Sequence, residues 1–495
     1  MLTSTTWLAL IVEAIRLIFA QPGPPANTFA QAHALVAKYG AADPRPGDPW
    51  PVILNAAELY EAVVQETQAR FTTPDGNHLT FNPLDAVEPV DPQDGIDKLR
   101  ARDAAIFGLS RLADRGFFDR LAAIADLGPG ICLEPAGAMQ TLSCPASTGL
   151  ARRLARVLQA QRRLCAAAGD AKGYTRALRT SLALARAGGF QFGQLSRLIS
   201  MAATQNALID LRDDTLRASF APDSRPVLLQ VVRDQALLPP SRFWLESAAS
   251  EFDSVIAATH TLDPSGDGRI LISRWRHVLF GATALSAIFS AESGQAGPLE
   301  WPDLGPLLNV AGVFYAPRSQ TQRRASEFIQ RYVALADLPA DAVPDAAAEL
   351  KRWLQSLPDT EMAARDWGLI VSDTAAFSLR RDVDWLMLRD GVITMLAVES
   401  YRVANGRLPA SLDALVPAVL PALPRDPFGA GPFIYRVTDA ADARPGFGYT
   451  LYSVWSDGRD DAGRRVDLRF KQETTSPRQR SGCDYIVNDL AGQSR

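Results

Sequence analysis

The sequence contains very little histidine and cysteine, the side chains that most often hold zinc in structural sites. Four of each occur among 495 residues. The cysteines, Cys132, Cys144, Cys165 and Cys483, show no CxxC spacing, and no pair of histidines lies near them. We therefore expect no tetrahedral zinc site. Cys132 and Cys144 flank a loop that contains proline and glycine; the alternatives there are a disulfide, if the protein is exported, and two reduced thiols.

The motifs of the common enzyme classes are also missing. His33, His78, His260 and His277 lie in no HExxH motif, nucleophile elbow or Cys/His pattern. The sequence has neither a Walker A loop nor a glycine-rich dinucleotide-binding turn. We therefore predict that the protein is not an enzyme. The alternative is an enzyme of the hydrolase class with its site in a cleft of the helical region, which a pocket gathering titratable residues with shifted pKa values would favour.

Positive charge is not in excess. The formal net charge is -4 at pH 7 and the isoelectric point is about 5.7. A nucleic-acid partner needs a clustered positive surface, so we expect none. A hydrophobic content of 47% with 21% charged residues is typical of folded domains, and the chain is too long for one core. Most basic residues are arginine, which indicates GC-rich coding and makes the chain resemble large helical proteins of GC-rich bacteria.

No apolar run is long enough for an ordinary membrane span. The longest candidate, Trp7 to Ala20, has about 14 residues where a span needs ~20, and it contains Glu13 and Arg16. Two alternatives follow for residues 1–25. They form either a signal peptide or membrane anchor, or an amphipathic helix that packs on the fold or lies on a surface.

Helical periodicity dominates residues 26–380. Between 148 and 212, apolar residues recur at spacings of three and four in three segments, separated by Gly169 and by Gly188 and Gly189. This pattern predicts three consecutive helices packed antiparallel. Since no fixed-period consensus is present, we predict irregular stacked helix hairpins, an α-solenoid-like layout. Further helices are predicted at 27–40, 51–71, 96–115, 117–127, 225–236, 242–261, 270–292, 320–337, 345–357 and 360–404, the last broken near Asp373 or Asp382.

Two segments differ from this helical pattern. Glycine and proline at 293–319 predict a long connection that divides the helical region into two subdomains. From 381 to 470 we predict a small α+β domain, because proline recurs after Gly406 and the aromatic runs at 433–435 and 449–452 are typical of strands. The polar residues 471–495 predict a flexible tail. The fold class is therefore mainly α, with a small α+β domain at the C-terminus.

Five landmarks follow one another in that C-terminal domain. They are Ala-Val-Glu-Ser-Tyr-Arg-Val-Ala-Asn-Gly-Arg-Leu-Pro at 397–409, Ser-Leu-Asp-Ala-Leu at 411–415, Leu-Pro-Arg-Asp-Pro-Phe-Gly at 423–429, the strand at 449–452, and the acidic segment 453–468. In this order they resemble the C-terminal domain of the major pseudopilins of type II secretion systems. The sequence departs from that family because no prepilin cleavage motif with a long apolar helix is present and about 380 residues precede the domain.

The acidic segment is the better of two candidate calcium sites. The resemblance carries a ligand role to Ser453, Asp457 and Asp467. Asp460 and Asp461 are candidates by chemistry alone, because Ca²⁺ prefers about six to eight oxygen ligands. The alternative is a solvated turn whose acids pair with the two neighbouring arginines.

The second candidate is the segment Asp-Pro-Ser-Gly-Asp-Gly at 263–268, which matches several positions of an EF-hand loop. Its candidate ligands are Asp263, Ser265 and Asp267. Two ligand positions are filled by Leu271 and Arg274, where an EF-hand has oxygen donors. A structural turn is therefore the alternative to a calcium loop.

These observations favour a non-enzymatic scaffold or interaction protein of the bacterial cell envelope, with a pseudopilin-like C-terminal domain that calcium stabilises. We expect protein partners and a periplasmic or membrane-anchored location, with attachment through the N-terminus. Besides the enzyme alternative, a calcium-responsive binding module is a further alternative.

Overall fold

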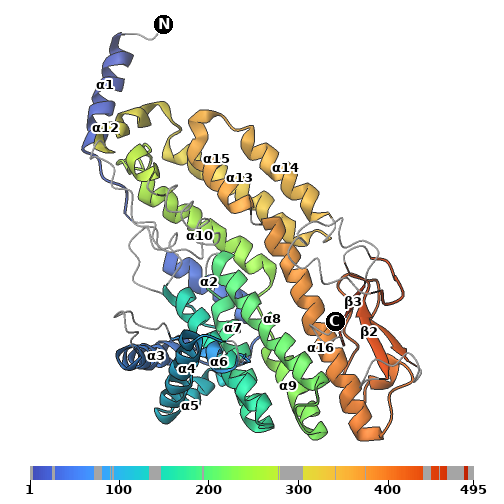
Figure 1. Ribbon diagram of the computed structural model, residues 1–495. Helices are drawn as coiled ribbons and strands as arrows, with labels where there is room; N and C mark the ends of the chain where they lie inside the picture. The colour runs from blue at the N-terminus through green and yellow to red at the C-terminus, as the bar shows by residue number, and fades with distance from the viewer. Residues whose placement is uncertain are drawn as a thin grey trace.

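The computed structural model of the 495-residue chain is mainly helical, with a small antiparallel sheet near the C-terminus (Figure 1). It describes residues 4–24, 28–71, 81–89, 91, 94–132, 146–191, 194–276, 278, 305–339, 342–373, 375–438, 448–455, 458–464 and 484–488.

The α-helices are α1 (Ser4–Ile18), α2 (Thr28–Gly40), α3 (Trp50–Arg70), α4 (Ile96–Asp114), α5 (Phe117–Ala122), α6 (Ala146–Ala167), α7 (Ala171–Gly189), α8 (Gln194–Leu216), α9 (Arg225–Gln235), α10 (Ser241–Thr259), α12 (Gly305–Leu308), α13 (Arg318–Ala334), α14 (Val343–Gln355), α15 (Met362–Asp373) and α16 (Ala375–Asn405). The 3-10 helices are η1 (Pro83–Ala86), η2 (Ala123–Asp126), η3 (Pro222–Ser224), η4 (Asn309–Phe314), η5 (Leu335–Asp337), η6 (Asp359–Glu361) and η7 (Leu412–Leu415). The strands are β1 (Ile434–Val437), β2 (Tyr449–Ser453) and β3 (Tyr485–Ile486).

The predicted hairpins around α7 are present in the structure. Gly169 adopts the left-handed backbone conformation (φ 67°) that ends α6, and the Asp170 side chain accepts a hydrogen bond from the backbone N–H of Gly173 to begin α7. α6 packs against α7, and α7 packs against α8. The helix that Asp170 caps is therefore packed between α6 and α8.

Three clusters of buried apolar side chains make up the interior of the described residues. The N-terminal core lies between α3, α4, α5, α6 and α7 and includes Trp50, Ile53, Leu112, Phe117, Leu154 and Leu184. The C-terminal core lies between α7, α8, α9, α16 and the sheet and includes Leu178, Leu208, Val232, Leu396, Leu451 and Val487. The α10 core lies between α2, α10, α13, α14 and α15 and includes Phe243, Trp244, Phe252, Phe328, Tyr332 and Trp367.

Two helices each contribute to two cores. α7 places Leu178 and Leu182 in the C-terminal core and Leu184 in the N-terminal core. α16 places Leu379 in the α10 core and Met387 and the residues after it in the C-terminal core. α16 is 31 residues long and crosses position 381, where the α+β domain was expected to begin. The C-terminal residues consequently share one core with helices of the region 26–380.

The sheet has the order β1-β2-β3, and both strand pairs are antiparallel. It lies beside the C-terminal part of α16, as Figure 1 shows. The expectation of a flexible tail over 471–495 is wrong for residues 484–488. Tyr485 pairs with Ser453, and Val487 is fully buried in the C-terminal core, because Val487 follows the paired residues of β3 and packs against α16.

Two other predicted boundaries change. The connection expected at 293–319 contains α12 and η4 within its described part, because Pro306 lies in the first turn of a helix, where proline is tolerated. Residues 293–304 lie outside the described residues. The expected helix 360–404 corresponds to α15, which ends at Asp373, and α16, which begins at Ala375; position 374 lies outside the described residues, and Asp382 lies inside α16.

The N-terminal helix α1 packs on η4 and α12 at one end of the molecule (Figure 1). Leu17 is buried, whereas Ile11, Val12, Ile15 and Phe19 are exposed. No helix among the described residues combines the length and the apolar character that crossing a membrane requires.

A buried ion pair joins the helices where the C-terminal core meets the α10 core. Arg197 of α8 donates two hydrogen bonds to Oδ1 of Asp382, with its Nη2 at 2.8 Å and its Nε at 3.1 Å. The other carboxylate oxygen accepts hydrogen bonds from Ser241 and from the indole nitrogen of Trp244, both on α10. The charged side chains are only 3% and 6% exposed. Asp382 therefore holds α8, α10 and α16 together.

Replacing Asp382 should destabilise the fold strongly. Asp382→Ala leaves the buried guanidinium of Arg197 without a counter-charge, and we expect the free energy of unfolding to fall by about 3–5 kcal/mol. Chemical denaturation followed by far-UV circular dichroism measures this. The control is Asp337→Ala, which removes an exposed partner of Arg242 and should cost less than about 1 kcal/mol. Equal costs in the two variants would contradict the role of Asp382.

Candidate functional site

The EF-hand-like segment folds as a hydrogen-bonded turn. Oδ1 of Asp263 accepts hydrogen bonds from the backbone N–H groups of Ser265 and Asp267, at 2.9 and 3.0 Å, and from the Ser265 hydroxyl. These hydrogen bonds hold the pKa of Asp263 below its ordinary value. The oxygen that would begin a calcium loop is thus already used to fix the turn.

Asp267 connects the same turn to α13. Its Oδ1 accepts a hydrogen bond from the backbone N–H of Ser319, in the first turn of α13, and its Oδ2 accepts one from the Ser319 hydroxyl, both at 2.9 Å. A carboxylate at this end of a helix satisfies backbone N–H groups and favours the helix dipole. Of the two EF-hand positions without oxygen donors, Leu271 is buried and Arg274 is exposed. This arrangement supports the structural turn.

His260 lies immediately before the turn and is fully buried. Its Nδ1 is 3.0 Å from Oγ1 of Thr259, which already donates its proton to the carbonyl of Val255. The ring therefore donates from Nδ1, and Nε2 lies 3.4 Å from the hydroxyl oxygen of Thr321. Burial lowers the pKa of His260 to about 4, and the positive charge of Arg318 acts in the same direction. His260 is a neutral part of the interior. His33 is exposed, and His78 and His277 lie outside the described residues.

Near the C-terminus, the carboxylate of Asp426 accepts hydrogen bonds from its own corner and from the end of β2. Its Oδ1 accepts hydrogen bonds from the Ser453 hydroxyl (2.8 Å) and from the backbone N–H of Phe428 (3.0 Å), and its Oδ2 accepts one from the backbone N–H of Val454 (3.0 Å). Burial raises the pKa of Asp426, and these hydrogen bonds oppose the rise. Ser453, a predicted ligand, thus serves to attach the corner at 423–429 to β2.

The helix end, the corner and the strands pack together. Tyr435 of β1 donates a hydrogen bond from its hydroxyl to the carbonyl of Pro409, at 2.9 Å. Glu399, fully buried on α16, pairs with Arg225 of α9 at 2.9 Å and with Arg402. These contacts bring the landmarks at 397–409, 423–429 and 449–452 into one unit.

Three carboxylates of unequal status lie at the acidic turn after β2: Asp460 and Asp461 belong to the turn, and Asp484 precedes β3. Asp460 accepts hydrogen bonds from the Tyr452 hydroxyl (2.9 Å) and the Ala462 backbone N–H (2.8 Å) and pairs with Arg436 (3.0 Å). In contrast, Oδ2 of Asp461 and Oδ1 of Asp484 are buried and have no hydrogen-bond partner within the described part of the chain. The predicted ligands Asp457 and Asp467 lie outside the described residues.

Asp484 is a residue that sequence reasoning missed, because it lies in the stretch assigned to the tail. Its other oxygen accepts a hydrogen bond from the backbone N–H of Gly463, at 2.8 Å. Burial raises the pKa of Asp484; the hydrogen bonds from Gly463 and Asp461 oppose this, and the negative charges of Asp460 and Asp461 add to it. No group of three or more histidine, cysteine, aspartate or glutamate side chains is arranged to hold a metal ion within the described ranges.

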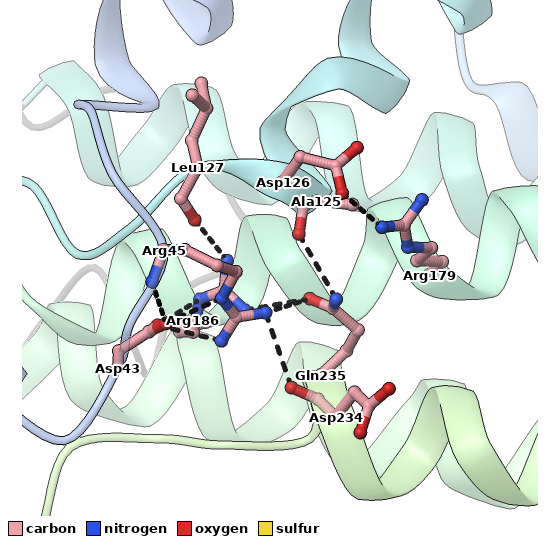
Figure 2. A network of polar contacts seen from close by, with 9 residues as sticks. All are labelled: Asp43, Arg45, Ala125, Asp126, Leu127, Arg179, Arg186, Asp234 and Gln235. Carbon is pink, nitrogen blue, oxygen red and sulfur yellow. Dashed lines mark hydrogen bonds and ion pairs between the residues drawn. The ribbon is translucent and has the colours of Figure 1, made fainter.

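A second polar network, shown in Figure 2, joins segments that are far apart in sequence. The buried guanidinium of Arg186 on α7 donates to the side-chain oxygen of Gln235 (2.8 Å) and to the carbonyl of Leu127 (2.7 Å). Arg45 pairs with Asp43 (2.7 Å) and donates to the same Gln235 oxygen (2.9 Å). Burial lowers the pKa of Arg186 to about 10, and Arg45 contributes to the shift. Because these side chains hydrogen-bond to one another, the network joins the segment before α3 to α7 and α9.

A cavity beside α7 bears on the enzyme alternative. It has a volume of about 400 Å³, and its titratable lining residues are Lys172, Arg176 and Arg179 on α7. Arg176 pairs with Asp119, and Arg179 pairs with Asp126. No histidine, cysteine or carboxylate is among the described residues that line it.

No protein-family model, curated protein or solved structure matches this chain. The likeness of residues 397–468 to pseudopilins therefore stays a prediction. The disulfide alternative at Cys132 and Cys144 is also untested, since Cys144 lies outside the described residues, while Cys165 is a free thiol.

The buried neutral His260 should make stability depend on pH. Its folded pKa of about 4 lies below the ordinary 6.5, so between these values the unfolded chain binds more protons, and acidification favours unfolding. His260→Gln should therefore remove about 2 kcal/mol of the change in unfolding free energy between pH 7 and pH 5.

Urea denaturation of the wild type and the variant at both pH values measures this difference. The matched control is His33→Gln, at an exposed position, which should alter the pH dependence by less than about 0.5 kcal/mol. An identical pH dependence in the wild type and the His260 variant would disprove the assignment.

Proposed function

We propose that the chain is a non-enzymatic scaffold of the bacterial cell envelope whose C-terminal unit, similar to that of pseudopilins, is stabilised by calcium. The observation that carries the calcium part is the pair of buried carboxylate oxygens without hydrogen bonds, Oδ2 of Asp461 and Oδ1 of Asp484. A buried carboxylate oxygen without a hydrogen bond is costly, and a divalent cation is one of the few groups that offsets that cost.

The backbone of this turn supports the same proposal. Ala462 and Gly463 both have positive φ values, 62° and 77°, so the chain turns sharply between Asp461 and the segment that pairs with Asp484. A tight turn of this kind brings carboxylate and carbonyl oxygens toward one point, which suits the roughly six to eight oxygen ligands of Ca²⁺. Asp461 and Asp484 would be the ligands, with further oxygens from the same turn.

Two features of the described side chains support the scaffold part of the proposal: buried charges that link helices, and an exposed apolar surface. The buried charged groups around Asp382, Glu399 and Arg186 bridge different helices. An exposed apolar surface, which we call the α1 patch, consists of Ile11, Val12, Ile15, Phe19 and Phe314. α1 and η4, which carries Phe314, pack against each other. Exposed apolar patches of this kind are typical of surfaces that bind a protein partner or a membrane.

Calcium should raise the melting temperature of the full chain through the Asp461 and Asp484 pair. Asp484→Asn removes one buried charge and its repulsion from Asp460 and Asp461. We therefore expect the variant to melt higher than the wild type in chelator and to lose the response to calcium.

Differential scanning fluorimetry with millimolar calcium or with chelator checks both changes. Asp413→Asn, at an exposed position of η7, is the control and should keep the wild-type response. The calcium proposal fails if calcium leaves the wild-type melting temperature unchanged.

The envelope location is tested by fractionating cells that make the full-length tagged protein. We expect the protein in the membrane or periplasmic fraction, and we expect Ile15→Asp with Phe19→Asp to release any membrane-bound protein, because charge on the α1 patch opposes burial in an apolar surface. Ile106→Asp, an exposed apolar position on α4, is the matched control. Recovery of the wild type wholly in the soluble cytosol would rule out this part of the proposal.

A further inference from the structure

A second cavity, separate from the C-terminal unit, lies between α6, α7 and α8. It has a volume of about 320 Å³. Its polar lining comprises Arg152, Arg156, Gln159 and Arg162 of α6, Ser181 of α7 and Asn206 of α8. The remaining wall is made of small and aliphatic side chains, mainly from α8. We refer to it as the α6 cavity.

The spacing of residues along α6 explains why the arginines meet there. Positions 152, 156, 159 and 162 differ by three or four, so they share one face of a helix. Arg152 and Arg156 are exposed, whereas Arg162 is only 2% exposed. The cavity therefore has two accessible guanidinium groups and a third that is buried.

The positive charge of this cavity is only partly neutralised. Arg162 pairs with Asp210 through Nη2 at 3.0 Å and donates from Nη1 to the Ser181 hydroxyl. Its Nε is buried and has no acceptor among the residues that the structure describes. Asp210 is shared, since it also pairs with Arg163 at 3.1 Å. A buried N–H without an acceptor is costly, so this site favours an additional anion.

Arg152 and Arg156 add charge without a compensating carboxylate, because neither forms an ion pair within the described ranges. The neighbouring Arg153 differs, since it pairs with Glu61 at 2.9 Å. The larger cavity beside α7 also differs, because two of its three cations are paired there. Three arginines and one shared carboxylate leave a surplus of two positive charges at the α6 cavity.

We propose that the α6 cavity binds a small organic phosphate. The guanidinium group is planar and donates pairs of parallel N–H bonds, which match the oxygens of a phosphate. A phosphomonoester carries close to two negative charges near neutral pH, which balances the surplus. A volume of about 320 Å³ is at the lower end of the range for small-molecule sites, and the aliphatic wall would contact the organic part of the ligand.

The test uses phenyl phosphate as the probe and the full-length protein in isothermal titration calorimetry at constant ionic strength. We expect phenyl phosphate to bind more tightly than either benzoate or inorganic phosphate. The comparison with benzoate tests the preference for a dianion. The comparison with inorganic phosphate tests the contribution of the aliphatic wall. Binding of benzoate or inorganic phosphate as tight as that of phenyl phosphate would overturn the assignment to an organic phosphate.

Two double variants locate the site. Arg152→Gln with Arg156→Gln removes the two accessible guanidinium groups and should weaken phenyl phosphate binding at least about tenfold, as expected for charge-assisted hydrogen bonds. Arg120→Gln with Arg153→Gln removes the same charge from exposed positions outside the cavity. This control should weaken binding less than about twofold.

All four positions are exposed, so both double variants should melt within a few degrees of the wild type, which circular dichroism checks. No heat of binding in the wild type at millimolar phenyl phosphate, or an equal loss of affinity in the two double variants, would overturn the proposal. Neither result would bear on the calcium turn, because that turn lies on different elements.

Discussion

The contact between Arg197 and Asp382 is the constraint on which the arrangement of the long helices depends. Asp382 lies on α16 between Leu379, which belongs to the α10 core, and Met387, which belongs to the C-terminal core. A charged residue at that point would be costly unless it were fully paired, and α8 and α10 both supply donors to it. Because buried ion pairs tolerate little change in geometry, this contact fixes the position of α16 relative to two other helices. The two hydrophobic cores on either side can then form around a helix of defined placement.

The placement of α16 determines the environment of the C-terminal unit. Glu399, further along the same helix, pairs with Arg225 of α9, and the sheet covers the adjoining apolar face. The corner at Asp426 and the acidic turn at Asp460 are attached to β2, which packs against a helix whose other end belongs to the α10 core. A cation bound at that turn would stabilise a unit that shares its core with α7, α8 and α9. The arginines of the α6 cavity are positioned by α6 itself.

The sequence predicted the helices well because amphipathic periodicity is a local property. The segments around Gly169, Asp170 and Gly188 carry their own start and stop signals, and the structure has α6, α7 and α8 there. β3 could not be predicted, because two paired residues have no periodicity and depend on β2 for their hydrogen bonds. The roles of Asp382, Asp484 and Arg162 were hidden for another reason. A charged side chain within a helix or a polar tail is typical of a solvated surface, and only tertiary contacts reveal that it is buried.

Backbone hydrogen exchange in the full chain with Asp382→Asn tests the central claim most directly. If the contact with Arg197 positions α16 between two cores, exchange should become faster together in α8, α10 and α16, because the three helices lose a shared anchor. Faster exchange confined to the single turn of α16 around position 382, with α8 and α10 unchanged, would contradict the account.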